Sequence, residues 1–271
     1  AVYDRIVATS REVGITWAGH ISQAVGLEHT LRTHQSTIDH LDGFVEALAS
    51  DDVQQRLLAN QPVPPTDVIR SIDPTKIRRW ATAARDAGVW SVPTAFLWES
   101  LYAKYEPEPA SQRPEMQYAP PQMVNGWSQQ KRNRSRADSS VTASDVQRFL
   151  AARRQLLKAL ADAGAGLLMG TDSPQMFNVP GFALHREIRL TQEAGVSPYK
   201  VLESGTRNVA TYVGKELKLD DQFGTIAVGK RADLVLLDAN PLSDVANVAA
   251  RAGVMVRGRW VPKEAIDRGL A

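Results

Sequence analysis

The sequence contains no cysteine among its 271 residues, and this absence excludes several kinds of chemistry. Disulfide bonds, thiolate metal sites and cysteine nucleophiles are all ruled out, so any metal ion must be bound by His, Asp, Glu or a modified Lys. The absence does not decide the cellular compartment, because a protein without cysteine suits an oxidising and a reducing environment equally. We therefore make no prediction of localisation.

Long apolar runs and a large net charge are also missing. No apolar stretch approaches the ~20 residues that a membrane-spanning helix needs, and the first residues lack the charged and apolar regions of a signal peptide. A formal net charge of +2 is too small to indicate binding to nucleic acid or to an anionic membrane, so we expect neither partner. The 43% hydrophobic and 23% charged residues are instead typical of a soluble globular protein with a sizeable core.

Glycine follows an amphipathic helical segment at three places, Gly14, Gly88 and Gly164, and a short apolar run begins soon after each of them. Glycine is the preferred residue just past a helix C-terminus, and short apolar runs bounded by turn residues are typical of buried strands. Because strands that alternate with helices form parallel sheets with crossover helices, the pattern predicts an α/β fold. The predicted strands are residues 15–20, 36–40, 89–94 and 166–170.

Residues 99–143 interrupt this alternation. The segment is rich in Pro, Gln and Ser and has weak periodicity, so we interpret it as an inserted loop, either a lid over a substrate or a plain surface insertion. It contains the basic run Lys131–Arg136. No aromatic residues are interleaved with these charges, so the run indicates a solvated surface rather than an RNA contact.

The last part of the chain changes to strand-like patterns. Residues 224–238 predict two short strands around a Gly-Lys turn, and residues 254–261 predict a closing hairpin. Apolar and polar residues alternate imperfectly along residues 232–237, so we expect both faces of this layer to be largely covered. The sequence therefore divides into a larger unit, residues 1–214, and a small β-layer, residues 215–271.

Three of the predicted strands lead into a side chain that can bind a metal ion: His20, His40 and Asp172. The C-terminal ends of parallel strands meet at one edge of the sheet, which is the active-site face of α/β barrels. Two imidazoles and a carboxylate suit zinc or a similar divalent ion. Each residue also has a structural interpretation, because a histidine at a strand end often only makes a hydrogen bond and Asp172 can cap the turn that follows it. The agreement of three strand ends favours the metal site.

The segments around these residues resemble the metal-dependent amidohydrolase superfamily, in particular its imidazolonepropionase-like and prolidase-like members. Gly19–His20 is similar to the family's fifth-strand histidine, Ile38–Gly43 to its sixth-strand I-E/D-H segment and Gly170–Asp172 to its eighth-strand aspartate. Thr206–Ala210 and Gly224–Leu234 resemble the helix after the barrel and the small β-sandwich that flanks it. The resemblance implies strands 5–8 of a (β/α)8 TIM-type barrel, followed by a small C-terminal β-sandwich domain.

The resemblance also implies a reaction. His20, His40 and Asp172 would bind zinc or another divalent ion, with one or two ions in the complete enzyme. Asp172 would in addition be catalytic, acting as a general base toward a metal-bound water and then passing the proton to the leaving nitrogen. The implied activity is hydrolysis of a C–N bond in a small amide, cyclic amide or peptide-like substrate. The loops that would select the substrate come from the whole barrel, so its identity stays open.

The chain departs from the family in what it lacks. It contains no His-x-His pair, which the family carries on its first strand, and no counterpart of the fourth-strand Lys or Glu. Its opening, Ala1–Val7, looks like the middle of an amphipathic helix, which suggests that upstream sequence is missing.

Four strands cannot close an eight-stranded barrel, so we expect an N-terminal half-barrel, or a second chain supplying it, as a partner. The chain alone should be inactive or nearly so, and it should tend to form homo-oligomers through its open sheet edges. A non-catalytic half-barrel that serves as a scaffold or assembly partner is the alternative function.

Overall fold

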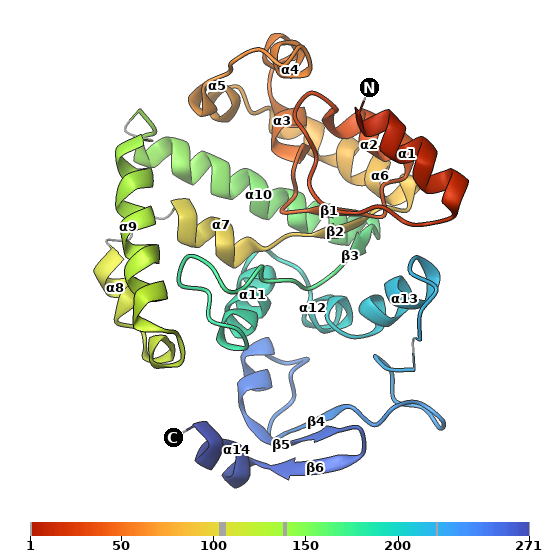
Figure 1. The fold of residues 1–271 in the computed structure, drawn as a ribbon, viewed down its shortest axis with the longest axis vertical. Helices are drawn as coiled ribbons and strands as arrows, with labels where there is room; N and C mark the ends of the chain where they lie inside the picture. The colour runs from red at the N-terminus through yellow and green to blue at the C-terminus, as the bar shows by residue number, and fades with distance from the viewer. Residues whose placement is uncertain (1, 103–106, 138–139, 221, 271) are drawn as a thin grey trace.

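A three-stranded parallel sheet forms the centre of the molecule in the computed structural model (Figure 1). β1 (Thr37–Asp39), β2 (Trp90–Val92) and β3 (Gly166–Leu167) neighbour one another in that order, so their C-terminal ends share one edge. The α/β arrangement predicted from the sequence is confirmed. The structure describes residues 2–102, 107–137, 140–220 and 222–270.

The expected first strand, residues 15–20, is not a regular strand of this sheet. Within residues 15–20, all of which the structure describes, Gly19 is the one residue that forms a β-bridge, in parallel with Ile38. The Trp17 carbonyl also accepts a 2.9 Å hydrogen bond from the Ser36 amide. The segment therefore runs beside β1 in the position of an edge strand. Its outer side faces no other strand of the described sheet, which removes half of the pairing that would keep it extended.

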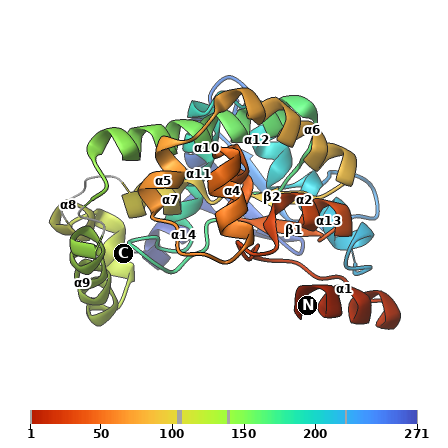
Figure 2. The same cartoon turned by 90° about the horizontal axis from the view of Figure 1, so that it is seen from above.

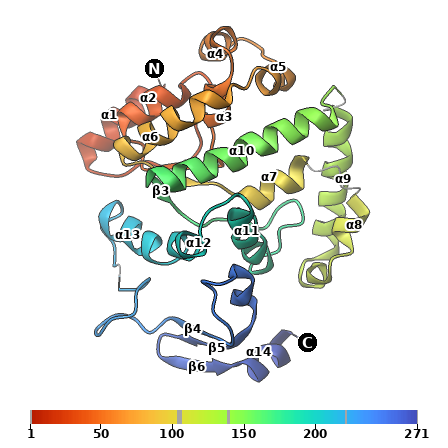
Figure 3. The ribbon, with the colours of Figure 1, turned by 180° about the vertical axis from the view of Figure 1, so that it is seen from behind.

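Helices cover one face of the sheet. α6 (Ile77–Ala87) and α10 (Ala143–Ala163) lie against each other on that face (Figure 3), and α2 (Gly26–Thr33) contacts α6. The main core lies between the sheet and these helices, because Ile38 of β1 and Leu167 of β3 join one buried apolar cluster with residues of all three. Burial of this apolar surface is the main force that holds the layers together.

The three glycine stops predicted from the sequence are confirmed. Gly14, Gly88 and Gly164 follow α1 (Val2–Val13), α6 and α10 with φ angles of 70°, 66° and 78°, a left-handed conformation that favours glycine. α1 stands at the margin of the main body (Figure 2). The other helices before β3 and the inserted segment are α3 (Phe44–Leu48), α4 (Asp51–Leu58), α5 (Pro65–Arg70), the 3-10 turn η1 (Pro74–Lys76) and α7 (Ala95–Tyr102).

Residues 99–143 are mostly helical where the structure describes them, so the prediction that this segment is a loop is wrong. Besides the end of α7 and the start of α10, they form α8 (Pro107–Ser111), the 3-10 helix η2 (Pro114–Tyr118) and α9 (Pro121–Ala137).

The packing of α9 gives the physical reason. Trp127 is buried against Phe177 of the loop after β3, with ring centres 5.7 Å apart. Lys131, which belongs to the basic run expected to be solvated, is buried too, and its ammonium group donates to the carbonyls of Ser100 and Leu101. Burial lowers the pKa of Lys131 to about 8. Tertiary contacts of this kind leave no mark on local periodicity. The side chains of residues 135–136 lie outside the described ones.

A second, antiparallel sheet follows the first. Three helices lead to it: α11 (Phe182–Glu193), α12 (Pro198–Ser204) and α13 (Arg207–Lys215). The sheet has the strand order β4 (Leu234–Leu237), β5 (Arg251–Val256) and β6 (Arg259–Pro262). Two further elements pack against it: the 3-10 helix η3 (Val245–Ala249) and α14 (Lys263–Leu270). Figure 1 shows this layer at the opposite end of the molecule from α4 and α5.

Two expectations for the tail are wrong. Residues 224–230 contain no strand, and their apolar side chains Ile226 and Val228 are exposed. Val235 and Leu236 of β4 are also exposed, so the two faces of the layer are not both covered. Alternation shows which residues share a face of a strand, but not whether another segment packs on that face.

None of the helices that the structure describes combines the length and the apolar character that crossing a membrane requires.

Candidate active site

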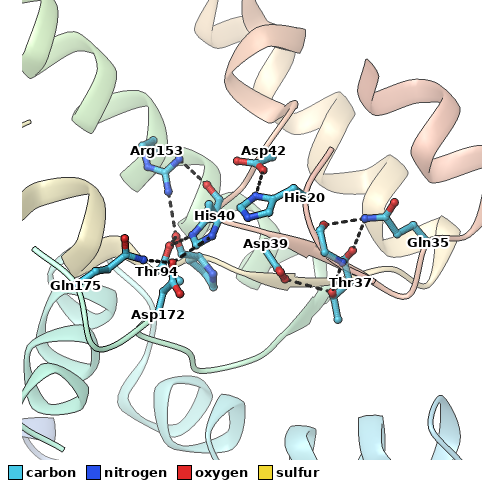
Figure 4. Close-up of polar contacts among 12 residues, drawn as sticks. His20, Gln35, Thr37, Asp39, His40, Asp42, Thr94, Arg153, Asp172 and Gln175 are labelled. Carbon is cyan, nitrogen blue, oxygen red and sulfur yellow. Dashed lines mark hydrogen bonds and ion pairs between the residues drawn. The ribbon is translucent and has the colours of Figure 1, made fainter. Parts of the chain in front are cut away.

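The backbone is left-handed at a residue that follows each strand of the parallel sheet. His40, Thr94 and Asp172 have φ angles of 58°, 46° and 54°. Left-handed backbone is uncommon for any residue with a Cβ, and it is a clear outlier for a β-branched residue such as Thr94. Such outliers cluster at functional sites. Figure 4 shows that the three side chains meet at the C-terminal edge of the sheet.

His40 lies at the centre of this group. Its side chain is only 10% exposed, and burial lowers its pKa. Nδ1 lies 2.7 Å from the Thr94 hydroxyl oxygen, and Nε2 lies 3.5 Å from Oδ2 of Asp172. The ring stacks on that of His20 with a centroid distance of 4.8 Å. The structure therefore brings together all three residues predicted from the sequence.

His20 differs from His40 in its surroundings. Its side chain is 71% exposed, and its Nδ1 lies 2.7 Å from Oδ2 of Asp42. The hydrogen bond to Asp42 raises the pKa of His20 above its ordinary value, whereas burial lowers that of His40. The two stacked rings thus favour opposite protonation states: a charged form at the solvent and a neutral form inside.

Asp172 is held by its own loop. Its side chain is 43% exposed, and Oδ2 accepts a hydrogen bond from the side-chain amide of Gln175. The side chain of Asn178 donates to the Thr171 carbonyl just before it, at 3.3 Å. These contacts turn the carboxylate toward His40 and leave it open to solvent (Figure 4).

The three side chains carry the kinds of donor atom that bind a divalent ion. Nδ1 of each histidine is engaged by a protein oxygen, which leaves Nε2 for a metal. The 3.5 Å between His40 Nε2 and Asp172 Oδ2 is close to the roughly 3.3 Å between two ligands that share a tetrahedral zinc ion at ~2.0–2.1 Å. Among the residues that the structure describes, however, no three or more His, Asp or Glu side chains are already arranged as a metal site. His20, mostly in solvent, is the least fixed of the three.

The sequence as a whole matches a model of the amidohydrolase family over residues 2–261. The chain belongs to the amidohydrolase family. This match includes every site residue described above and both sheets except the last residue of β6, so the resemblance inferred from short motifs is confirmed. No curated protein matches the chain.

Solved structures share the fold. The chain is 25% identical to bottromycin amidohydrolase with a TM-score of 0.68, and the match covers 98% of this chain and 54% of that one. It is 16% identical to a Xaa-Pro dipeptidase with methionine bound in the active site (TM-score 0.54, covering 96% and 48%). It is 22% identical to a prolidase complexed with N-methylphosphonate-L-proline (TM-score 0.52, covering 95% and 47%). The chain thus spans about half the length of the structures that it matches.

Sequence reasoning missed several polar residues around His40. Arg153 of α10 is buried and donates 2.7 Å and 2.9 Å hydrogen bonds to the carbonyls of His40 and Pro93. Its guanidinium lies 4.6 Å from the ring centre of Trp98, and burial lowers its pKa to about 10. In the sequence it is one of two adjacent arginines on an amphipathic helix, and nothing local marks it as buried. Asp42 could have been found, because it lies within the motif that carries His40.

Glu187 of α11 is a second buried charge that the sequence does not reveal. Its two carboxylate oxygens accept 2.8 Å hydrogen bonds from the backbone amides of Ala95 and Phe96, at the start of α7. Burial raises its pKa to about 7. Together, Arg153 and Glu187 hold the connection between β2 and α7 from both sides.

A cavity of about 460 Å³ lies next to the site. Its lining combines apolar side chains, among them Ile21, Leu57 and Trp80, with polar and charged ones that include Asp42 and Glu46. It borders the partner of His20 but none of the three predicted ligands. It is therefore a neighbouring pocket of the site rather than its centre.

Proposed function

We propose that this chain forms half of a metal-dependent amidohydrolase that cleaves a C–N bond in a small amide, cyclic amide or peptide-like substrate. One observation carries the proposal: His40 Nε2 and Asp172 Oδ2 face each other across 3.5 Å at the C-terminal edge of a parallel sheet, and the His20 ring stacks on His40. Membership of the amidohydrolase family supports it, because catalytic side chains of α/β barrels lie at that edge.

Each residue has a role in this proposal. His20 and His40 hold zinc or another divalent ion through Nε2, and Asp172 holds it through a carboxylate oxygen. When bound, such an ion would make a water more acidic and polarise the scissile carbonyl. Asp172 is close to His40 and reaches solvent, so its carboxylate would serve as the base that accepts a proton and donates it to the leaving nitrogen.

The remaining ligands come, in this proposal, from an N-terminal half-barrel in the same polypeptide or in another one. The match to about half of each solved structure supports this partner. The sheet gives further support, because α6 and α10 cover one of its faces and no helix of the described chain lies across the other to the same extent (Figures 1 and 3). The division at residue 214 and the flanking β-sandwich belong to the same proposal. A separate antiparallel sheet after residue 214 supports the division, and it would form one layer of the sandwich.

Two measurements test the proposal: zinc content and the hydrolysis of small amides. Both are made on the purified 271-residue chain, with and without a polypeptide that supplies the first four strands. The chain alone should bind zinc weakly and show no turnover, because half of the barrel is missing. In the completed barrel, Asp172→Asn should lower turnover far more than zinc content, whereas His40→Ala should lower both. His34→Ala is the matched control, since the His34 side chain is exposed and contacts only the Ala87 carbonyl among described polar groups, and it should change neither.

Two results would contradict the proposal. Robust turnover by a monomer of this chain alone would show that the half-barrel interpretation is wrong. A completed barrel that folds but neither retains zinc nor hydrolyses amides would favour the alternative, a non-catalytic scaffold.

A further inference from the structure

The hydroxyl of Thr94 lies beside one ring nitrogen of His40 and bears on which nitrogen carries the proton. Oγ1 donates its single hydrogen to the Pro93 carbonyl at 2.8 Å. The same oxygen lies 2.7 Å from His40 Nδ1, and it has only lone pairs left to offer there. With the hydroxyl hydrogen assigned to the Pro93 carbonyl, Nδ1 is the donor of that hydrogen bond. A neutral imidazole carries one N–H, so Nε2 of His40 is left with a free lone pair.

The geometry on the other side of the ring agrees. If the proton were on Nε2, it would face the Asp172 carboxylate and form a hydrogen bond of ~2.7–3.2 Å. The distance from Nε2 to Oδ2 is 3.5 Å, longer than such a bond. Two acceptor atoms facing each other across this gap are what a site for a bound cation requires.

Thr94 is held in place from both sides. The Pro93 carbonyl before it accepts a 2.9 Å hydrogen bond from Arg153, whose other terminal nitrogen donates to the His40 carbonyl at 2.7 Å. The amides of Ala95 and of the next residue donate to Glu187 at 2.8 Å each. These contacts fix the backbone around a threonine whose left-handed φ of 46° is unfavourable for a β-branched residue. Structures keep such strain only where their surroundings hold it.

We propose that Thr94 is a positioning residue of the candidate metal centre: it holds His40 in the Nδ1–H tautomer with the Nε2 lone pair facing Asp172, and Arg153 and Glu187 hold Thr94 in the conformation that does so. The proposal rests on the proposed function only in assigning that lone pair to a metal. The tautomer itself is inferred from hydrogen bonds within this chain alone.

Two substitutions of Thr94 separate the effect of its branched shape from the effect of its hydroxyl group. Thr94→Val keeps the branched shape but leaves His40 Nδ1 without an acceptor, so the ring loses the preference for the Nδ1–H form. Thr94→Ser keeps the hydroxyl and should behave like the wild type. Ser91→Ala is the matched control, because the Ser91 hydroxyl is also buried next to this strand end but has no hydrogen-bond partner in the described structure.

The test is a long-range proton–nitrogen NMR correlation of the histidine rings in the nitrogen-15-labelled 271-residue chain. It is recorded well above the ordinary histidine pKa of ~6.5, and the His40 signals are identified by their loss in His40→Gln. We expect the Nδ1–H pattern in the wild type, Thr94→Ser and Ser91→Ala, and its loss in Thr94→Val. If the His40 ring of the wild type carries its proton on Nε2, the proposal is overturned without any variant. The proposal can therefore be tested even if Thr94→Val fails to fold. An unchanged tautomer in folded Thr94→Val would overturn it as well.

Zinc titration of the same proteins distinguishes this inference from the proposed function. If both are right, Thr94→Val should weaken zinc binding about 10–100-fold relative to the wild type, as loss of a partner that orients a metal ligand does. If the tautomer behaves as expected but neither the chain nor the completed barrel binds zinc, the proposed function fails and the role of Thr94 in fixing His40 stands. If zinc binds equally to the wild type and to folded Thr94→Val, the positioning role is refuted while the metal site stands.

Discussion

Replacing the buried carboxylate of Glu187 should change how the stability of this protein depends on pH. Burial raises the pKa of Glu187 to about 7 from an ordinary value of 4.5. The folded state therefore binds the proton more tightly than the unfolded chain, and between these two pH values the free energy of unfolding falls as the pH rises. At about 1.4 kcal/mol for each unit of pKa difference, the loss comes to about 3 kcal/mol and is complete above pH 7.

Glu187→Gln is neutral at every pH and should abolish this slope. Glutamine has one acceptor oxygen where the carboxylate has two, so one of the amides of Ala95 and Phe96 loses its partner, at a cost of about 1–3 kcal/mol that does not depend on pH. The variant should thus be about 1–3 kcal/mol less stable than the wild type near pH 4.5, and equal to it or up to about 2 kcal/mol more stable near pH 8. The difference between the two proteins should change by about 3 kcal/mol across this range.

Urea unfolding followed by circular dichroism at several pH values between 4.5 and 8 measures this change. Glu193→Gln is the matched control, because Glu193 lies on the same helix, is half exposed and pairs with Arg189 across 3.5 Å. It should keep the pH dependence of the wild type. If the stability of Glu187→Gln ran parallel to that of the wild type across the whole range, the folded pKa of Glu187 would not be raised and the reasoning would be refuted.

Three further substitutions test the packing. Gly166→Ala would place its Cβ 2.6 Å from the ring of Trp90 and should destabilise the protein by about 1–3 kcal/mol in thermal unfolding, and an unchanged melting temperature would contradict this contact. Gly126→Ala should stabilise the protein by about 0.5–1 kcal/mol, because Gly126 lies within α9 with open space around it. A loss of stability would show that the helix does not accept a larger side chain at this position. Thr142→Ala removes the hydroxyl that caps α10 through the Asp145 amide and should cost about 1 kcal/mol in urea unfolding without changing zinc binding.

The parallel sheet could be predicted because its signals are local. Gly88 and Gly164 mark helix ends through their own backbone conformation, and the apolar runs after them need no information from elsewhere in the chain. Residues 15–20 carry the same local signals but form a single bridge, because an edge strand also depends on a partner on its outer side. The helices within residues 99–143 could not be predicted, because they have weak local signals and depend on contacts with distant parts of the chain. They are supported by a contact between Trp127 and Phe177, which lie far apart in the sequence.

The candidate site divides in the same way. His40 and Asp172 could be predicted because each follows a strand, and strand ends of a parallel sheet share an edge. Thr94 also follows a strand, but a threonine carries no chemistry that singles it out until its hydroxyl is seen beside the imidazole. Arg153 and Glu187 belong to helices with many charged residues, and only the fold shows that these two are buried.

The His40 side chain is held more firmly than that of His20, and this difference bears on how a metal site would assemble. Three contacts with groups of this chain orient the mostly buried His40: the Thr94 hydroxyl, the Arg153 guanidinium and the stacked ring of His20. His20, in contrast, is 71% exposed and is oriented by Asp42 and the stacking contact. On the proposed function, the pair of His40 and Asp172 is therefore organised before the barrel is complete. Weak zinc binding by this chain alone would then reflect the missing ligands and the loosely held His20, because little further ordering of His40 is needed.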